Sequence, residues 1–313
     1  MKRIFYILII SSICFTYSCI EQFDLNLPEE SRLVVDGLIT NETGPYYIRL
    51  TESRNNLYFD PYMDSLYIFT GILGGKSIKD ALVIISSDDG QTDTLVAGQD
   101  SIAELYLNEN GEYVYTIPSD NLHGIKYGGY QTTTLKGEIG VNYFLRIIWK
   151  GKEYNASCIL PDLPQVDSIT YNKVKAAVGK DDYFVPKIYF REPKNEKNYY
   201  LFNFSGNNRV WGYSILNDEF LGDYVNGVDV FKGESVDWWM TAYPYAKQEF
   251  TISMESITEE AFDFYQALIN QYKNDGGSYS PAPASPPTNI GNGGLGFFRA
   301  SSVNKIFGVM PAK

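Results

Sequence analysis

The sequence predicts a mainly β protein made of two antiparallel β-sandwich-like domains, the second with one α-helix near residues 257–274. Three observations predict this fold. Short runs of β-branched and aromatic residues alternate with Gly, Pro, Asn and Asp turns. The composition, 44% hydrophobic and 20% charged, is that of a globular chain. The length of 313 residues suits one large domain or two ordinary ones.

The chain begins with a segment typical of a secretory leader. Lys2 and Arg3 precede an apolar run at residues 4–10, which is shorter than the roughly 20 residues of a transmembrane helix. Residues 16–19, Thr-Tyr-Ser-Cys, resemble a bacterial lipobox. We therefore expect residues 1–18 to be a lipoprotein signal peptide and Cys19 to carry the lipid. The alternative is an ordinary signal peptide with an incidental cysteine.

Lipidation at Cys19 has consequences for the rest of the chain. Residues 19–32 are acidic and contain a proline, as expected of a tether between the lipid and a folded domain. Loss of Lys2 and Arg3 with the leader removes two positive charges, which takes the net charge from −12 to −14. This charge suits a body held off an anionic membrane surface.

Of the three cysteines, only one is expected to keep a free thiol in the mature chain. Cys14 leaves with the leader and Cys19 is acylated, so Cys158 has no partner for an intramolecular disulfide. Cys158 lies in a strand-like run without a basic neighbour that would lower its pKa. We interpret it as a buried small hydrophobe rather than a nucleophile.

Residues 33–163 are expected to form an Ig-like β-sandwich domain. A Gly-Pro turn at residues 41–45 predicts a hairpin, and the Asp-Asp-Gly at residues 88–90 predicts a second turn. Residues 52–77 read as a long loop, and the two prolines within residues 160–164 mark the end of the domain. The expected strands are at residues 32–40, 46–51, 81–85, 111–116, 141–149 and 153–160.

Residues 164–313 are expected to form a second β-rich domain with one helix. Ser256 and Glu259 have the spacing of a capping box. Helical spacing of apolar residues follows until Gly276, and residues 277–294 form a Pro/Gly/Ser loop. The apolar residues of this helix are Ala261, Phe262, Tyr265, Leu268, Ile269 and Tyr272. The expected strands are at residues 166–171, 185–190, 198–204, 210–215, 248–254, 296–300 and 301–306.

The residue types needed for catalysis or metal binding are sparse. His123 is the only histidine, and no Gly-x-Ser-x-Gly elbow accompanies it. Zinc sites need clustered His and Cys. The acidic pairs at residues 88–89 and 181–182 lack the calcium-loop pattern, which favours polar turns. We predict no catalytic residue, metal or cofactor, although 38 acidic residues leave a glycosidase carboxylate pair open. The acidic balance argues against nucleic acid as a partner.

The aromatic content of 15% gives the strongest indication of a binding site. Adjacent Trp238 and Trp239 would point to opposite faces of a strand, so at most one enters the core of a simple sandwich. Tyr243 and Tyr245 follow closely. We expect these four residues to contact a partner or ligand, either a protein or a glycan. The alternative is packing beneath a neighbouring loop.

The order of these motifs resembles a family of Bacteroidetes outer-membrane lipoproteins known as domain of unknown function 4249. The resemblance rests on Cys19 followed by acidic residues, and on segments at residues 33–50, 81–90, 111–113, 140–152 and 289–298, with the helix around Tyr265. It implies an outer-membrane lipoprotein, commonly found beside TonB-dependent receptors. It implies no established enzyme activity and provides no catalytic residues.

These observations give three functional hypotheses. The first is a non-catalytic, lipid-anchored outer-membrane protein that serves as an accessory or ligand-capture subunit of a TonB-dependent β-barrel transporter. The second is a glycan-binding or adhesive surface module, and the third is a glycoside hydrolase with an unrecognised carboxylate pair. The ligand, a glycan or a peptide, stays open. We expect display at the cell surface, and the periplasmic orientation stays open.

Overall fold

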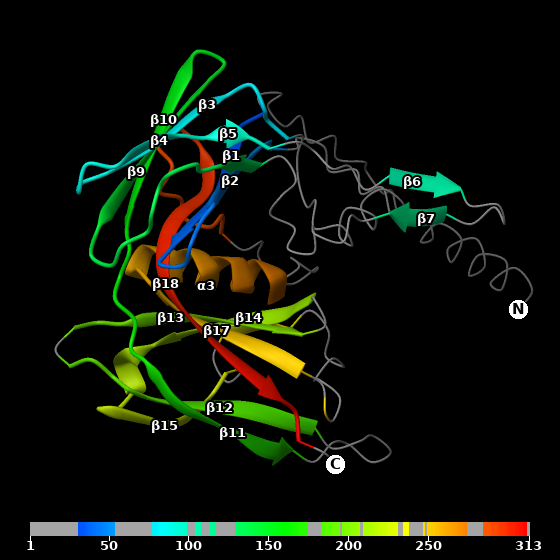
Figure 1. Ribbon diagram of the computed structural model, residues 1–313, viewed down its shortest axis with the longest axis vertical. Coiled ribbons are helices and arrows are strands. Elements are labelled where there is room, and N and C mark those ends of the chain that lie inside the picture. Colours follow the sequence, from blue (N-terminus) through cyan, green and yellow to red (C-terminus); the bar gives the residue numbers. More distant parts are fainter. Residues whose placement is uncertain are drawn as a thin grey trace, which may run out of the picture. The chain divides into compact units, whose positions relative to one another are not determined.

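A computed structural model describes twelve segments of the chain. The fold is mainly β, with several antiparallel sheets, and the described segments contain one α-helix (Figure 1). This confirms the predicted fold class. The described residues are 31–53, 77–98, 104–107, 113–116, 129–174, 183–194, 196–206, 209–230, 234–237, 247, 249–273 and 284–311.

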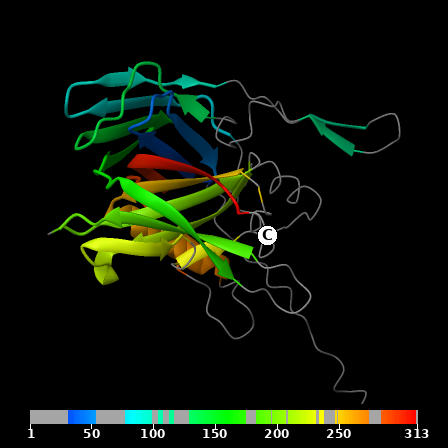
Figure 2. The same ribbon diagram turned by 60° about the horizontal axis from the view of Figure 1, so that its bottom comes forward.

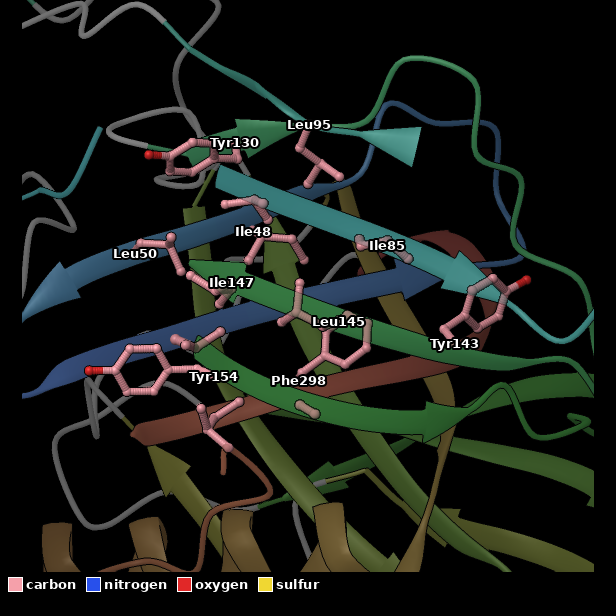
Figure 3. Packing of buried hydrophobic residues seen from close by; sticks show 14 of the residues in the cluster. Ile48, Leu50, Ile85, Leu95, Tyr130, Tyr143, Leu145, Ile147, Tyr154 and Phe298 are labelled. Atoms are coloured by element: carbon pink, nitrogen blue, oxygen red, sulfur yellow. The ribbon is translucent and has the colours of Figure 1, made fainter. Parts of the chain in front are cut away.

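The first half of the chain supplies two layers that we call the first sandwich. Its core includes Ile48 and Leu50 from one layer and Leu145 and Ile147 from the other (Figure 3). One layer contains β1 (Leu33–Thr40), β2 (Tyr47–Glu52), β8 (Gly129–Gln131) and β5 (Val96–Ala97). The other contains β10 (Lys152–Ile159), β9 (Asn142–Trp149), β3 (Leu82–Ser87) and β4 (Thr92–Thr94).

Turn chemistry explains the hairpins of the first sandwich. The predicted β1–β2 hairpin is confirmed, with Asp36 opposite Arg49. The β9–β10 hairpin turns at Lys150 and Gly151, which have φ angles of 47° and 72°. Two positive φ values are what a tight hairpin with the correct twist requires, and glycine adopts them without cost. Gly90 serves the β3–β4 turn in the same way at φ 96°.

The second half of the chain supplies the second sandwich. Its core joins Phe190 and Ile188 of one sheet to Phe202, Phe250 and Ile252 of the other. One sheet contains β11 (Val166–Val174), β12 (Tyr183–Arg191) and β15 (Tyr224–Asp229). The other contains β16 (Glu234–Asp237), β14 (Arg209–Asn217), β13 (Tyr199–Gly206) and β17 (Glu249–Ile257). The remaining short elements are a 3-10 helix, η1 (Asp218–Phe220), and an antiparallel pair of strands. The two strands are β6 (Glu104–Leu107) and β7 (Tyr113–Thr116).

The last strand, β18 (Leu295–Val309), belongs to both sandwiches. Its first half pairs in parallel with β1 from Leu295 to Ser301, and its second half pairs antiparallel with β17 from Ser302 to Val309. Figure 2 shows β18, in red, between the blue first strands and the strands of the second sandwich. The two strands expected at residues 296–306 are therefore one. The predicted domain boundary at residues 163 and 164 lies between β10 and β11, and β18 pairs with strands on both sides of it.

The single described α-helix, α3 (Glu259–Lys273), lies within the predicted range. Its predicted cap at Ser256 is wrong, because Ser256 pairs with Tyr200 and Ser302 inside the sheet. Thr258 caps the helix instead, and its Oγ1 accepts the Ala261 N–H at 3.3 Å. The helix buries Ala261, Phe262 and Ile269 against a cluster that includes Leu201, Ile215 and Phe297.

Candidate interaction surface

The residues that the sequence singles out for function lie mostly outside the described segments. They stay predictions, and the structure brings none of them to a described site. These residues are Cys19, His123, Asp181, Asp182, Trp238, Trp239, Tyr243 and Tyr245.

The acidic turn at Asp88 and Asp89 is described, and its carboxylates accept hydrogen bonds from the turn and from the start of β9. Asp88 accepts hydrogen bonds from the Asn142 backbone N–H at 3.1 Å and from Asn142 Nδ2 at 2.7 Å. Asp89 accepts from Gln91 Nε2 at 2.8 Å and from the Ser87 hydroxyl. The described segments hold no group of three or more His, Cys, Asp or Glu residues able to bind a metal. The contacts support the polar-turn interpretation.

Cys158 packs against the core of the first sandwich as a small apolar side chain. Burial raises the pKa of its thiol well above the ordinary value, and the positive charge of Arg299 offsets only part of that rise. The thiol is therefore protonated at neutral pH and a poor nucleophile. This agrees with the interpretation of Cys158 as a small hydrophobe.

Two buried glutamates have hydrogen-bonding neighbours that hold them in place. Glu192 is 6% exposed and accepts from the Tyr200 hydroxyl and from Asn198 Nδ2, each at 2.9 Å. Burial raises the pKa of Glu192, and these two donors offset part of the rise. Glu255 forms an ion pair with Arg299, whose guanidinium also lies 5.5 Å from the Tyr265 ring. Both carboxylates thus serve the packing of their surroundings.

The most exposed large apolar side chain among the described residues is Phe307, at 74%, and Val309 near it is 53% exposed. Both lie in the second half of β18, where β17 pairs along one edge. The Val303 N–H donates to Asn41 Oδ1 at 2.8 Å, and Asn41 follows the end of β1 on the opposite edge. The N–H and C=O groups of successive residues in a strand point alternately to its two edges. Counted from Val303, the N–H and C=O groups of Lys305, Phe307 and Val309 therefore also point away from β17.

We call this part of β18 the open edge. It consists of the backbone of Lys305, Phe307 and Val309 together with the side chains of these three residues. Among the strands that the structure describes, none pairs with β18 on this side beyond Ser301. The turn after β1 reaches only its beginning, where Glu42 binds Lys305 Nζ at 2.7 Å. Unpaired strand edges are templates for further strands, and proteins commonly block them.

The first half of β18 shows how this chain blocks an edge. Asn289 Oδ1 accepts the Phe298 N–H at 2.9 Å, and Asn289 Nδ2 donates to the Phe298 carbonyl at 2.7 Å. The same loop reaches the edge of β10, where the Gly291 N–H donates to the Asn155 carbonyl at 2.8 Å. Asn292 Nδ2 donates to the Glu153 carbonyl at 2.6 Å. This loop joins the free edges of the two layers, and the open edge has no such cover in the described segments.

Sequence reasoning missed the open edge. The expected strand ended at residue 306, before Phe307 and Val309. No local pattern reveals which edge of a strand stays unpaired, since that depends on the strand order of the whole sheet. The run of apolar residues at positions 306, 307 and 309 is a signal for a strand but not for its neighbours.

The described segments form a β-sandwich-like protein in which no described strand pairs with one edge of β18 beyond Ser301. No described helix is both long and apolar enough to cross a membrane. The chain belongs to the family described as domain of unknown function (DUF4249), whose model matches residues 20–306. Comparison with curated proteins gives no match.

Proposed function

We propose that the protein is a lipid-anchored outer-membrane protein that acts as an accessory or ligand-capture subunit of a TonB-dependent transporter. The observation that carries the proposal is where the family match begins. It starts at residue 20, directly after Cys19, as expected if Cys19 is the first residue of the mature chain. The larger of the two compact units of the chain begins at Ser31, so the acidic residues predicted to form the tether precede it in the sequence.

A binding role agrees with the described surface. The open edge presents backbone hydrogen-bonding groups beside exposed Phe307 and Val309. Exposed aromatic residues are common anchors of protein interfaces. The described acidic side chains at Asp88, Asp89, Glu192 and Glu255 are engaged by their neighbours. The site therefore supports recognition of a partner better than hydrolysis.

The anchor is tested with Cys19→Ser and a matched control, Cys158→Ser. Each variant is expressed from its own locus, labelled with a tritiated fatty acid and fractionated. The proposal predicts that Cys19→Ser loses both label and membrane association, while Cys158→Ser retains them. Label on Cys19→Ser, or its retention in the membrane, would contradict the anchor.

The transporter role is tested by isolating the tagged protein at native abundance in mild detergent. We expect a large outer-membrane β-barrel to accompany it in a fixed ratio. Recovery of the protein as a monomer without a β-barrel would contradict the proposed role.

A glycan-binding module is the second candidate, because Trp238 and Trp239 are adjacent in the sequence and flat rings stack on sugars. A glycan array followed by calorimetry tests it, with Trp238→Ala and Trp239→Ala as variants. Binding that either variant abolishes would favour this candidate. Absence of binding by the unmodified protein would remove it.

A further inference from the structure

We propose that the open edge of β18 binds an extended apolar segment of a partner protein as an added β-strand. The proposal deepens the proposed function, because it names how the partner is held. Three observations carry it. No described strand pairs with the backbone of the open edge, Phe307 and Val309 are exposed on one of its faces, and apolar residues of the second sandwich lie on the other.

The backbone of the edge is ready for a strand. In the regular β17–β18 register, residues 304, 306 and 308 direct their N–H and C=O groups to β17. Lys305, Phe307 and Val309 direct theirs outward. Strand addition to such an edge draws its affinity from main-chain hydrogen bonds and its specificity from alternate side chains. About five residues of a partner would match this length.

One face of an added strand would lie beside Phe307 and Val309. These residues stand on the same face of β18 as Arg299 and Phe297, beyond the part that α3 covers. Apolar side chains from the partner would remove the exposed ring of Phe307 from water. That burial favours association by roughly 25 cal/mol per Å² of apolar surface.

The other face of an added strand would lie at the rim of the second sandwich. The edge strand of its smaller sheet, β11, runs close to β18, since a Cβ at Gly308 would lie 2.7 Å from the Tyr171 hydroxyl. Ile306 on this face of β18 is partly buried and packs against the core of the second sandwich, as do Leu163, Val166 and Ile169. A partner segment with apolar residues on both faces would therefore close the sandwich.

The mature chain's own tether does not fit this edge. It leaves the compact unit at Ser31, near Leu295, with which Val34 pairs. Phe307 lies 12 residues further along β18, or roughly 40 Å at about 3.3 Å per residue. Reaching it would use nearly all of residues 19–30 and leave none to pair.

A second copy of the chain is also a poor occupant. Each copy carries a net charge of −12 in full length, so two copies repel one another. The acidic body instead favours a partner segment whose apolar run is flanked by Lys or Arg.

The test uses the full mature lipoprotein in detergent and a synthetic peptide probe. The probe has the sequence Lys-Lys-Thr-Val-Ile-Val-Thr-Lys-Lys with blocked ends, and binding is measured by fluorescence anisotropy. N-methylation of alternate residues spoils one edge of the peptide and leaves the other intact, so this peptide should still bind. N-methylation along both edges should weaken binding at least about ten-fold, because strand addition needs the N–H groups.

The protein variants probe the same contact from the other side. Phe307→Pro removes an outward N–H without taking a hydrogen bond from the β17 ladder, so the fold should survive. Phe307→Pro should weaken binding of the probe peptide at least about ten-fold. Phe307→Thr, which keeps the N–H, should weaken it less. The control Phe144→Thr alters a ring that is 45% exposed on the first sandwich and should have no effect.

The outcomes separate this proposal from the proposed function. Unchanged probe binding by Phe307→Pro, or by the peptide methylated on both edges, overturns strand addition. Absence of binding by the unmodified probe also overturns it for apolar, basic-flanked segments. If a β-barrel nevertheless accompanies Phe307→Pro as well as the unmodified protein, the transporter role stands without this contact. If the probe binds as expected but no barrel is isolated, strand binding stands and the transporter role fails.

Discussion

The side-chain amide of Asn289 pairs with the backbone of Phe298 in both directions. It accepts the Phe298 N–H at 2.9 Å and donates to the Phe298 carbonyl at 2.7 Å. One side chain thus takes the place of a neighbouring strand at this point of β18. Nine residues further along, Phe307 has no corresponding cover among the described residues. This contrast within one strand supports the proposal that the open edge binds a partner strand.

Asn289→Ala should destabilise the protein by about 1–3 kcal/mol, since it leaves the two backbone groups of Phe298 without their partner. Asn289→Asp should cost a similar amount because a carboxylate cannot donate to the Phe298 carbonyl. Urea unfolding measures the change. Asn304→Ala, on the same strand, is the control and should change the free energy of unfolding by less than about 0.5 kcal/mol. Equal losses for both positions would contradict the role given to Asn289.

Asp93 should make stability depend on acid. Its side chain is 3% exposed, and Oδ2 accepts the backbone N–H groups of Thr133 and Thr134 at 2.7 Å and of Leu135 at 2.9 Å. Burial raises the pKa of Asp93, but these hydrogen bonds outweigh it and the pKa is lowered overall.

A lowered folded-state pKa means that the stabilisation is complete above the unfolded pKa of about 3.9. It is lost as the pH falls through the folded value. Asp93→Asn should therefore be less stable than the unmodified protein at pH 7, by about 1–3 kcal/mol. The difference should shrink below about pH 4. Urea unfolding across pH 2.5–7 tests this, and a pH-independent difference would refute it.

The ion pair of Arg299 and Glu255 should be costly to break from one side. Their side chains are 12% and 6% exposed, so removal of one partner leaves a buried charge. Arg299→Met should destabilise by about 3–5 kcal/mol. Lys197→Met breaks an exposed pair with Glu259, whose side chains are 77% and 59% exposed, and serves as the control. That change should cost no more than about 1 kcal/mol.

Thiol counting tests both remaining cysteines together. Native mature protein should react with a thiol reagent more slowly than free cysteine, because Cys158 is partly buried and its raised pKa keeps the thiol protonated. After denaturation it should show one thiol, and none in Cys158→Ala. A second thiol after denaturation would show that Cys19 is unmodified.

The sequence predicted the turns and the helix, because residues close together in the chain determine these elements. Gly90 marks a turn that forms a hairpin, and the apolar spacing from Ala261 to Ile269 marks α3. The pairing of Val34 with Leu295 joins the two ends of the chain, and no local pattern encodes such a contact. Ser256 shows the same limit, because strand pairing on both sides takes a residue whose spacing suggests a helix cap.

The candidate functional features also fall into those that the sequence predicts and those that only the fold reveals. The sequence alone indicates the lipidation of Cys19, since a leader and its cleavage motif are contiguous. The open edge follows from the order of β17, β18 and β1, which only the three-dimensional arrangement reveals. The contact role of Trp238 and Trp239 stays a prediction from their adjacency in the sequence, because both residues lie outside the described segments.

The most direct test of the account is the mass of the complex that holds this protein in its own membrane. Protein extracted in mild detergent at native abundance is measured by native mass spectrometry. We predict one dominant species that contains the lipidated chain and a larger β-barrel subunit, and the loss of this species with Phe307→Pro. A dominant species of the lipidated chain alone would contradict it.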